Sequence, residues 1–337
     1  MNALMTLLRL PDLSAQLGLA RDAEAFVRLH FLYAASIAGI LGRLGSWTSR
    51  GELARQINAA HVDVLDALLE VGVALRELAR DGDHFRICGK RSAALAKGRG
   101  DALSAVIEEC VTYHAAVYRD FPKRLCNGLA GDYLTGKGEM VARSSRVLEP
   151  FMVEFVRQRV AGKGAVRMLE IGCGSGVYLR HAAEANPAAT GLGIDIQEGV
   201  VRETSARLVE WGLDGRFDVL RADIRKPAPE LVGPFDLITL YNNIYYFAPE
   251  ERVALLDGLR KRLRPGGSLA LTSMFQAGTT AAANFDLVLR STCGCSAMGT
   301  LGQLVEQLHE SRYANVVTDR LIPGQPFYAV TAKNPGP

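Results

Sequence analysis

Short apolar runs alternate with amphipathic segments over the second half of the chain. The apolar runs predict strands near 166–171, 191–196, 217–221, 235–241 and 268–273. Between them, apolar positions recur at helical spacing and predict helices near 177–186, 198–211 and 249–263. A late pair, 315–319 and 326–332, predicts an antiparallel edge. The pattern therefore predicts an α/β fold with a doubly wound, mostly parallel sheet of seven strands and helices on both faces.

The first hundred residues follow a helical pattern that ends in a hairpin. Helices are predicted at 23–44, 51–57 and 62–78, and Thr48 is a good N-cap for the second of these. The turn signal Arg80-Asp81-Gly82-Asp83 lies between apolar residues and predicts a β-hairpin. Three helices followed by a hairpin are typical of a winged-helix module.

A helical connector is predicted between these two patterns. The spacing predicts a helix over 101–120 that stops before Pro122, and a glycine-rich irregular segment over 128–138. Residues 139–160 read as mostly helical, with a break at Pro150. We therefore expect three regions, with boundaries at 1–100, 101–165 and 166–337.

Composition and charge exclude several classes of protein. The chain has 337 residues, of which 48% are hydrophobic and 22% charged, as in ordinary globular proteins. Its net charge of +3 indicates neither a nucleic-acid nor a membrane-surface partner. No apolar stretch has the composition of a membrane span, which needs about 20 apolar residues. Six dispersed cysteines without an export signal predict a cytoplasmic protein with reduced thiols.

The winged-helix pattern has two interpretations, DNA binding and dimerisation. A DNA-reading helix needs a basic face to neutralise phosphates. The helix expected to fill this role instead carries Asp63, Asp66, Glu70 and Glu77. We therefore expect residues 1–100 to form a dimerisation domain and the protein to be a homodimer.

A glycine-rich turn after the first predicted strand is the strongest chemical signal. It reads Glu170-Ile171-Gly172-Cys173-Gly174-Ser175-Gly176 and precedes a predicted helix. Glycines let the backbone approach a ligand, and the helix N-terminus offers free N–H groups. A dinucleotide fingerprint would need glycine at 177, where the chain has valine, and its pyrophosphate would not favour a carboxylate at 170.

Acidic residues stand at the ends of three successive predicted strands. Asp195 is placed to accept hydrogen bonds from both hydroxyls of a ribose. Asp223 is placed to bind an adenine amino group, and Ile196 and Ile224 to enclose the ring. Together with Glu170 they favour an adenosine ligand that carries positive charge and no phosphate.

These residues resemble the class I S-adenosylmethionine (SAM)-dependent methyltransferases, which have a Rossmann-like fold. Residues 170–176 resemble the family's first motif, and Leu263-Arg264-Pro265-Gly266-Gly267 resembles its turn before the fifth strand. The layout of the whole chain is similar to small-molecule methyltransferases of specialised metabolism. The resemblance implies SAM as cofactor, Gly172 and Gly174 at its site, and a connector that roofs the active site.

The segment after the fourth strand is rich in aromatic rings and amides. Tyr241, Tyr245 and Tyr246 can stabilise a sulfonium through cation–π contacts. Asn242 and Asn243 can orient the amino and carboxylate ends of SAM. We expect catalytic roles for Tyr245, Tyr246 and Asn242, cofactor binding by Tyr241, and a substrate contact by Asn243. None of the six histidines falls here to act as a general base.

The layout also resembles the metal-dependent α-keto acid C-methyltransferases of nonribosomal-peptide pathways. Those enzymes use histidine ligands where this chain has Tyr245 and Cys295, and an acid where it has Tyr246. We therefore predict no catalytic metal. Cys295 is expected to line the substrate pocket, with Ser273, Tyr113 and Arg143 as further pocket residues.

Three functions follow from these features. The first is transfer of a methyl group from SAM to a small-molecule acceptor, which leaves S-adenosylhomocysteine. The second is cyclisation of SAM itself, in which its amino group attacks its own γ-carbon to give azetidine-2-carboxylate and methylthioadenosine. Such a reaction needs a closed aromatic pocket and little else, because positioning supplies much of the barrier reduction. The third is a SAM-binding regulator that uses the winged helix.

Overall fold

The computed structural model describes residues 10–226, 231 and 233–336. They form two compact units, and the chain passes between these three times. The first unit holds the described residues up to Tyr118 together with Gly136–Val147. The second holds Arg119–Thr135 and the described residues from Leu148 onward. The expected connector, residues 101–165, is therefore divided between the two units.

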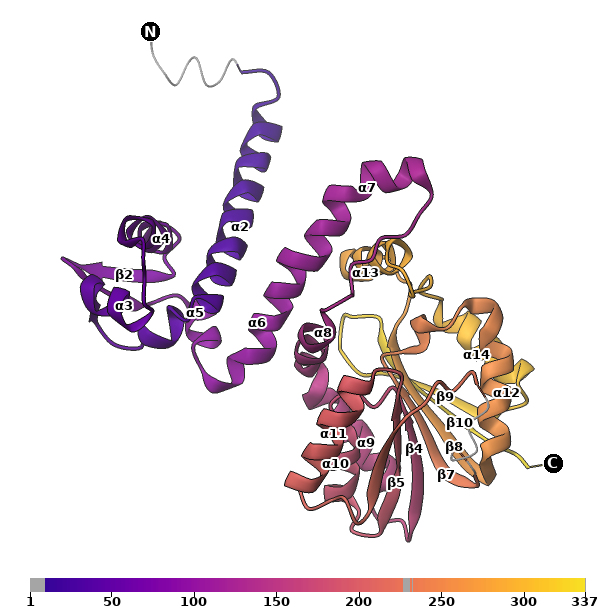
Figure 1. The fold of residues 1–337 in the computed structure, drawn as a ribbon. Coiled ribbons are helices and arrows are strands. Elements are labelled where there is room, and N and C mark those ends of the chain that lie inside the picture. The colour runs from indigo at the N-terminus through magenta and orange to yellow at the C-terminus, as the bar shows by residue number, and fades with distance from the viewer. Residues whose placement is uncertain (1–9, 227–230, 232, 337) are drawn as a thin grey trace. The chain divides into compact units, whose positions relative to one another are not determined.

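The second unit contains the predicted seven-stranded sheet (Figure 1), in the order β6-β5-β4-β7-β8-β10-β9. Strands β4 to β8 are parallel, whereas β10 is antiparallel to both of its neighbours. The bounds of the strands are β4 Val166–Ile171, β5 Ala189–Asp195, β6 Phe217–Arg221, β7 Phe235–Tyr241, β8 Leu263–Met274, β9 Ala314–Arg320 and β10 Phe327–Lys333. The turn expected at 263–267 is included in β8, whose pairing with β7 shifts register there.

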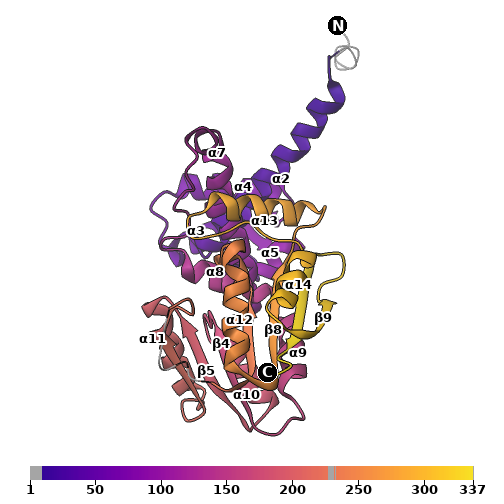
Figure 2. The same cartoon turned by 90° about the vertical axis from the view of Figure 1, so that its right-hand side faces the viewer.

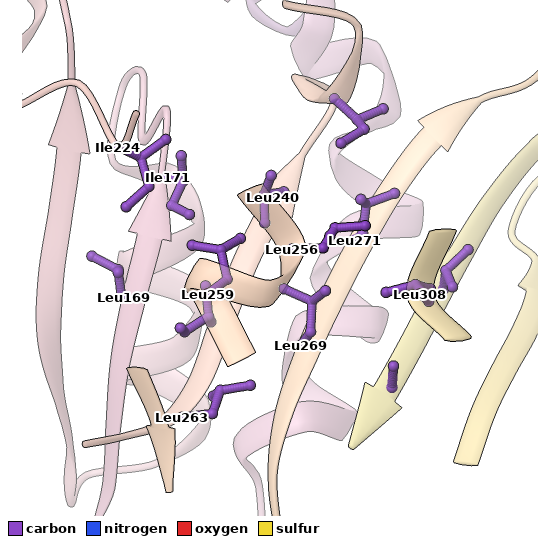
Figure 3. Packing of buried hydrophobic residues seen from close by; sticks show 14 of the residues in the cluster. Leu169, Ile171, Ile224, Leu240, Leu256, Leu259, Leu263, Leu269, Leu271 and Leu308 are labelled. Atoms are coloured by element: carbon purple, nitrogen blue, oxygen red, sulfur yellow. The ribbon is translucent and has the colours of Figure 1, made fainter. Parts of the chain in front are cut away.

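Helices cover both faces of this sheet, as the alternating pattern predicts. One face packs against α12 and α14, and Leu256 and Leu259 of α12 lie in a cluster with Leu169, Leu240 and other strand residues (Figure 3). Figure 2 views this side, with α12 in front of the strands. The other face packs against α9, α10 and α11. These helices span α9 Glu149–Val160, α10 Val177–Ala185, α11 Glu198–Glu210, α12 Arg252–Arg262 and α14 Leu301–Glu310.

The late strand pair has unequal surroundings. The pattern predicts an antiparallel edge, and β9 is that edge, with most of its residues exposed. Strand β10 instead lies between β8 and β9, and Phe327, Ala329 and Val330 are each 1% exposed. Side chains that alternate between two covered faces explain why this strand is apolar at nearly every position.

The first unit contains the predicted helices and hairpin. Its three-stranded antiparallel sheet has the order β1-β3-β2, and the hairpin of β2 and β3 is confirmed. The elements are α2 Leu13–Ile37, β1 Thr48–Ser49, α3 Arg50–Gln56, α4 Val62–Ala74, β2 Leu78–Asp81, β3 His84–Ile87, α5 Lys90–Leu95, α6 Asp101–Glu108 and α8 Gly138–Ser145. The helix predicted at 23–44 instead spans Leu13–Ile37, and the one predicted at 62–78 ends at Ala74, before β2 begins at Leu78.

The connector helix differs from its prediction at both the middle and the end. A single π-helical turn, Glu109–His114, separates α6 from α7, which spans Ala115–Asn127. The prediction that the helix stops before Pro122 is wrong, because α7 continues through it. The missing N–H of proline removes one bond of the ladder without ending the helix here. The predicted break near Pro150 falls at Arg146–Leu148, directly before α9.

The cap of α3 is Ser49 rather than the predicted Thr48. The Ser49 side chain accepts a hydrogen bond from the Glu52 backbone N–H at 3.3 Å. Thr48 is buried, and its hydroxyl donates to the carbonyl of Arg43 at 3.1 Å. Both residues are good N-caps by type, so sequence preference alone does not separate them.

We expect Ser49→Ala to lower the free energy of unfolding by about 1 kcal/mol, since one N–H at the start of α3 loses its acceptor. Urea denaturation followed by circular dichroism would measure the change. Ser49→Asp supplies another acceptor, so it should retain most of the stability. An equal loss in both variants would contradict the capping role.

Three of the four acidic residues expected on the recognition helix pair with arginines of their own unit. Asp66 accepts from Arg50 at 2.7 Å, and Glu70 pairs with Arg80 at 2.6 Å. Glu77 lies beyond the end of α4, and its side chain is 2% exposed. Its oxygens accept from Arg28 at 3.1 Å and from the Ser92 hydroxyl at 2.9 Å. Glu77 is therefore a buried structural residue and not part of a helix surface.

No helix in the part of the chain that the structure describes has the length and apolar character needed to cross a membrane.

Candidate functional site

The glycine loop joins β4 to α10 at the carboxyl edge of the sheet. Gly172 has φ +65°, and a Cβ there would lie 2.7 Å from Nδ2 of Asn243. That Nδ2 donates to the carbonyl of Ile171, so the loop and the segment after β7 are hydrogen-bonded together. Gly176 has φ +73°, and a Cβ there would meet Thr204 at 2.6 Å. Larger residues at either position would change the shape of the loop.

Glu170 is a buried acid beside this loop. It is 1% exposed, and its Oε2 has no hydrogen-bond partner among the described residues. Burial raises the pKa of Glu170 to about 8. A buried carboxylate is costly unless it is paired, so Glu170 holds a proton at neutral pH and ionises only with a cationic group beside it. This observation fits the ammonium group of SAM.

Two tyrosines lie close to Glu170 on the same face of the sheet. Tyr178 of α10 packs edge-on against Tyr241 of β7, with ring centroids 5.2 Å apart. Burial, and secondarily the charge of Glu170, raise the pKa of both phenols. The hydroxyl of Tyr241 and that of its strand neighbour Thr272 lack partners among the described residues. Tyr178 and Thr272 are residues that the sequence analysis missed.

Asp195 ends β5 next to the loop. Its Oδ2 accepts from the backbone N–H of Gly174 at 3.3 Å, and its Oδ1 accepts from that of Gln197 at 2.9 Å. These bonds fix the carboxylate and leave further lone pairs for a ligand. The adjacent Ile196 is 58% exposed, so its side chain is available for a ring contact.

Asp223 has a local partner that the sequence analysis did not anticipate. Arg225 donates from Nε and Nη2 to the two oxygens of Asp223, at 2.9 and 3.0 Å. This ion pair lowers the pKa of Asp223. Ile224 packs in the core on the α12 side of the sheet and is 8% exposed. The adenine contacts expected of both residues remain predictions.

The loop after β7 brings several predicted residues together. Tyr245 lies on the short helix Ile244–Tyr246. Its ring centroid is 4.9 Å from that of Tyr246, with the rings tilted, and 5.3 Å from that of Phe285, which it meets edge-on. Tyr245 and Cys295 pack against one apolar cluster, and Ser296 N–H donates to the Tyr245 carbonyl at 2.8 Å. Tyr246 is 38% exposed. Burial raises the pKa of Cys295 to about 11, so its thiol is neutral.

The two asparagines of this loop differ in role. Asn242 has φ +56°, and its N–H donates to the Thr272 carbonyl at 2.9 Å. Asn243 is buried, and its Oδ1 has no partner among the described residues, so it can still accept a bond from a ligand. Ser273 donates to the Met274 carbonyl at 3.0 Å. With Tyr245 it lines a cavity of only about 10 Å³.

A buried arginine fixes the far side of this loop. Arg252, which sequence reasoning missed, is 5% exposed and donates to the carbonyls of Phe247 and Ala297, at 3.0 and 3.2 Å. Burial lowers its pKa. Arg252 therefore connects two segments. One follows β7 and carries Tyr245; the other follows α13 (Thr280–Ser291) and carries Cys295.

Two residues predicted for the substrate pocket lie in the first unit. Tyr113 is in the π-helical turn and is 3% exposed. Arg143 donates to Asp101 at 2.6 Å and to Glu108 at 3.3 Å. These two acids occupy the guanidinium within its own unit. Pocket roles for Tyr113 and Arg143 remain predictions.

Within the described residues, no three His, Cys, Asp or Glu side chains gather as a metal site would require.

The sheet order, the glycine loop and the acids at the carboxyl ends of β4 and β5 and just after β6 match the class I SAM-dependent methyltransferase fold. Residues 168–267 match the family model described as a methyltransferase domain. Residues 168–267 therefore belong to a methyltransferase domain.

Known proteins share the domain or the whole fold. Nocamycin O-methyltransferase of Saccharothrix syringae is 39% identical over 108 residues, which cover 32% of this chain and 37% of that protein. An O-methyltransferase family protein from Burkholderia thailandensis has a TM-score of 0.76 at 18% identity, covering 95% of this chain and 98% of the other. Human N-acetylserotonin methyltransferase, solved with SAM, has a TM-score of 0.77 at 15% identity, covering 98% and 99%.

Proposed function

We propose that the protein binds SAM and transfers its methyl group to a small-molecule acceptor without a catalytic metal. The observation that carries this proposal is the buried, unpartnered carboxylate oxygen of Glu170 beside the glycine loop. The ammonium group of SAM would pair with this group once it loses its proton, whereas the group offers no positive charge to a phosphate. The aligned relative is the nocamycin O-methyltransferase, which favours a hydroxyl of a specialised metabolite as the acceptor.

The residues of the site have separable tasks in this proposal. Bound SAM supplies an electrophilic methyl group on its sulfonium. Glu170 and the Oδ1 of Asn243 would hold the ammonium, and Asp195 would accept bonds from the ribose hydroxyls. Tyr245 and Tyr246 would face the sulfonium and exclude water. With no histidine in the segment after β7, the acceptor would need to be ionised or strongly nucleophilic on its own.

The products formed from SAM test this proposal. The protein is incubated with SAM alone and with SAM plus a panel of phenols, thiols and amines, and sulfur products are identified by mass spectrometry. Adenosylhomocysteine that forms only with an acceptor supports methyl transfer. Methylthioadenosine with azetidine-2-carboxylate from SAM alone would overturn it in favour of cyclisation. SAM binding without turnover, together with DNA binding, would favour a regulator. Activity that persists after chelation would support the absence of a metal.

We expect SAM affinity to rise about tenfold per pH unit between roughly pH 6 and 7.5. Burial raises the pKa of Glu170 to about 8, so the free protein holds a proton on this carboxyl over that range. The ammonium of SAM binds the ionised form, so binding expels the proton, and this cost falls as pH rises. Isothermal titration calorimetry in two buffers of different ionisation enthalpy would count the released protons.

Glu170→Gln is the matched control, because it keeps the shape and removes the titrating group. It should bind SAM more weakly at pH 7.5 and show no proton release in this range. The same pH slope in the variant would assign the titration to another group.

A further inference from the structure

A second pocket lies at the opposite edge of the sheet from the glycine loop. Its volume is about 450 Å³, and it is lined by the beginnings of β4, β7 and β8 and by the end of antiparallel β10. The described chain ends close to this edge, at the point marked C in Figure 1. All of its lining residues belong to the second unit. We call it the basic pocket, because its charged lining consists of Arg159, Lys163, Arg264, Lys333 and Asp236.

Among the described residues that line the basic pocket, the single acid is already engaged. Asp236 pairs through Oδ1 with Arg264, and its Oδ2 accepts from the backbone N–H of Arg167 at 2.7 Å. The four cations and one acid leave a formal charge of +3 on the lining. That charge faces a hollow large enough for a nucleotide-sized molecule.

The remaining cations have no carboxylate partner among the described residues. Lys163 donates to the Arg159 carbonyl at 2.5 Å, and Lys333 donates to the hydroxyl of Ser268 at 2.8 Å and to the carbonyl of Gly266 at 3.2 Å. The Nε of Arg159 is buried and has no hydrogen-bond partner there. Each ammonium has three donors, so donors remain for a ligand in both lysines.

These cations also repel one another. Burial lowers the pKa of Lys163, and the positive charges of Lys333, Arg159 and Arg264 lower it further. A cluster of like charges destabilises the fold, and a bound anion would remove that cost. The pocket is therefore expected to bind most strongly a compact ligand with more than one negative charge.

We propose that the basic pocket binds a phosphate-bearing small molecule through a diphosphate group. A diphosphate carries two to three negative charges in a compact group and offers many acceptor oxygens to lysine and arginine donors. A single carboxylate would neutralise only one of the cations. The pocket volume exceeds that of the diphosphate, so a nucleoside or another organic group can occupy the remainder.

Calorimetric titration of the full-length protein with inorganic pyrophosphate tests the proposal. We expect one site, whose affinity falls at least tenfold in the double variant Lys163→Gln/Lys333→Gln. Lys261→Gln is the matched control, because Lys261 pairs with Asp257 on α12 and does not line the pocket. ADP should bind more tightly than pyrophosphate if an organic group also fills the pocket. Absence of binding to the wild type, or equal binding to the double variant, would overturn the proposal.

Two further measurements test whether pyrophosphate binds in the basic pocket and not at the proposed SAM site. SAM affinity should be the same with and without pyrophosphate, whereas competition would place pyrophosphate at the glycine loop and refute the assignment. The melting temperature of the wild type should rise with pyrophosphate, and that of the double variant should not. If the double variant fails to fold, the single variant Lys333→Gln replaces it and should lose part of the affinity.

Discussion

Replacing Asp195 with alanine is expected to weaken SAM binding by ~100-fold or more. In the proposed site this carboxylate accepts two charge-assisted hydrogen bonds from ribose hydroxyls, each contributing about 1.5–3 kcal/mol. The substitution also removes the acceptor of the Gly174 and Gln197 N–H groups, so the loop loses an anchor. Calorimetric titration with SAM at constant pH would measure the effect.

Two variants separate the ribose contact from general damage. Asp195→Asn keeps one carbonyl acceptor and should lose less affinity than Asp195→Ala. Asp218→Ala changes an exposed acid on the neighbouring strand β6 and should bind SAM as the wild type does. Unchanged affinity in Asp195→Ala would show that the ribose contact is assigned to the wrong residue.

Glu77→Ala should lower the free energy of unfolding by about 3 kcal/mol or more, because it breaks a buried charge network. The Glu77 carboxylate is the acceptor for Arg28, for Arg91 and for both the N–H and the hydroxyl of Ser92. Its loss leaves Ser92, which is 0% exposed, without that acceptor. Urea denaturation followed by fluorescence and circular dichroism would measure the change.

Glu70→Ala is the comparison for this prediction. Glu70 also forms an ion pair with an arginine, but both side chains are about half exposed. Exposed pairs contribute up to about 1 kcal/mol. A similar loss in both variants would show that burial of Glu77 does not set its contribution.

The central strands are predictable because each is an apolar run with turn residues at both ends. The expected bounds of β4, β6 and β7 agree with the structure, and β5 begins two residues earlier than expected.

The helices α13 and α14 were not predicted. For α14 a local signal is present, since Thr300 and Gln303 form a reciprocal cap, with bonds of 3.1 and 2.8 Å.

The site is only partly predictable, because some of its contacts join residues far apart in the chain. Glu170 and Asp195 follow from their positions at strand ends. The neighbours of Glu170, by contrast, come from the helix after the loop and from strand β7 about 70 residues later. No local pattern indicates that Tyr178 and Tyr241 meet. The Arg225–Asp223 pair is local in the sequence, but it was not predicted. An acid that pairs with a nearby arginine and an acid that faces a ligand have the same local sequence pattern.

The three passages of the chain between the two units have a consequence for their independence. Two domains joined by one linker can be cut apart or expressed separately, and their effective concentration depends on the length of that linker. Here residues 119–135 leave the first unit and the chain returns to it at 136, before leaving again after 147. A cleavage after residue 147 leaves the first unit whole but takes residues 119–135 from the second, and a cleavage before residue 119 takes residues 136–147 from the first. No single cleavage therefore yields both units complete. Separate expression of the two units is therefore expected to leave at least one of them without part of its structure.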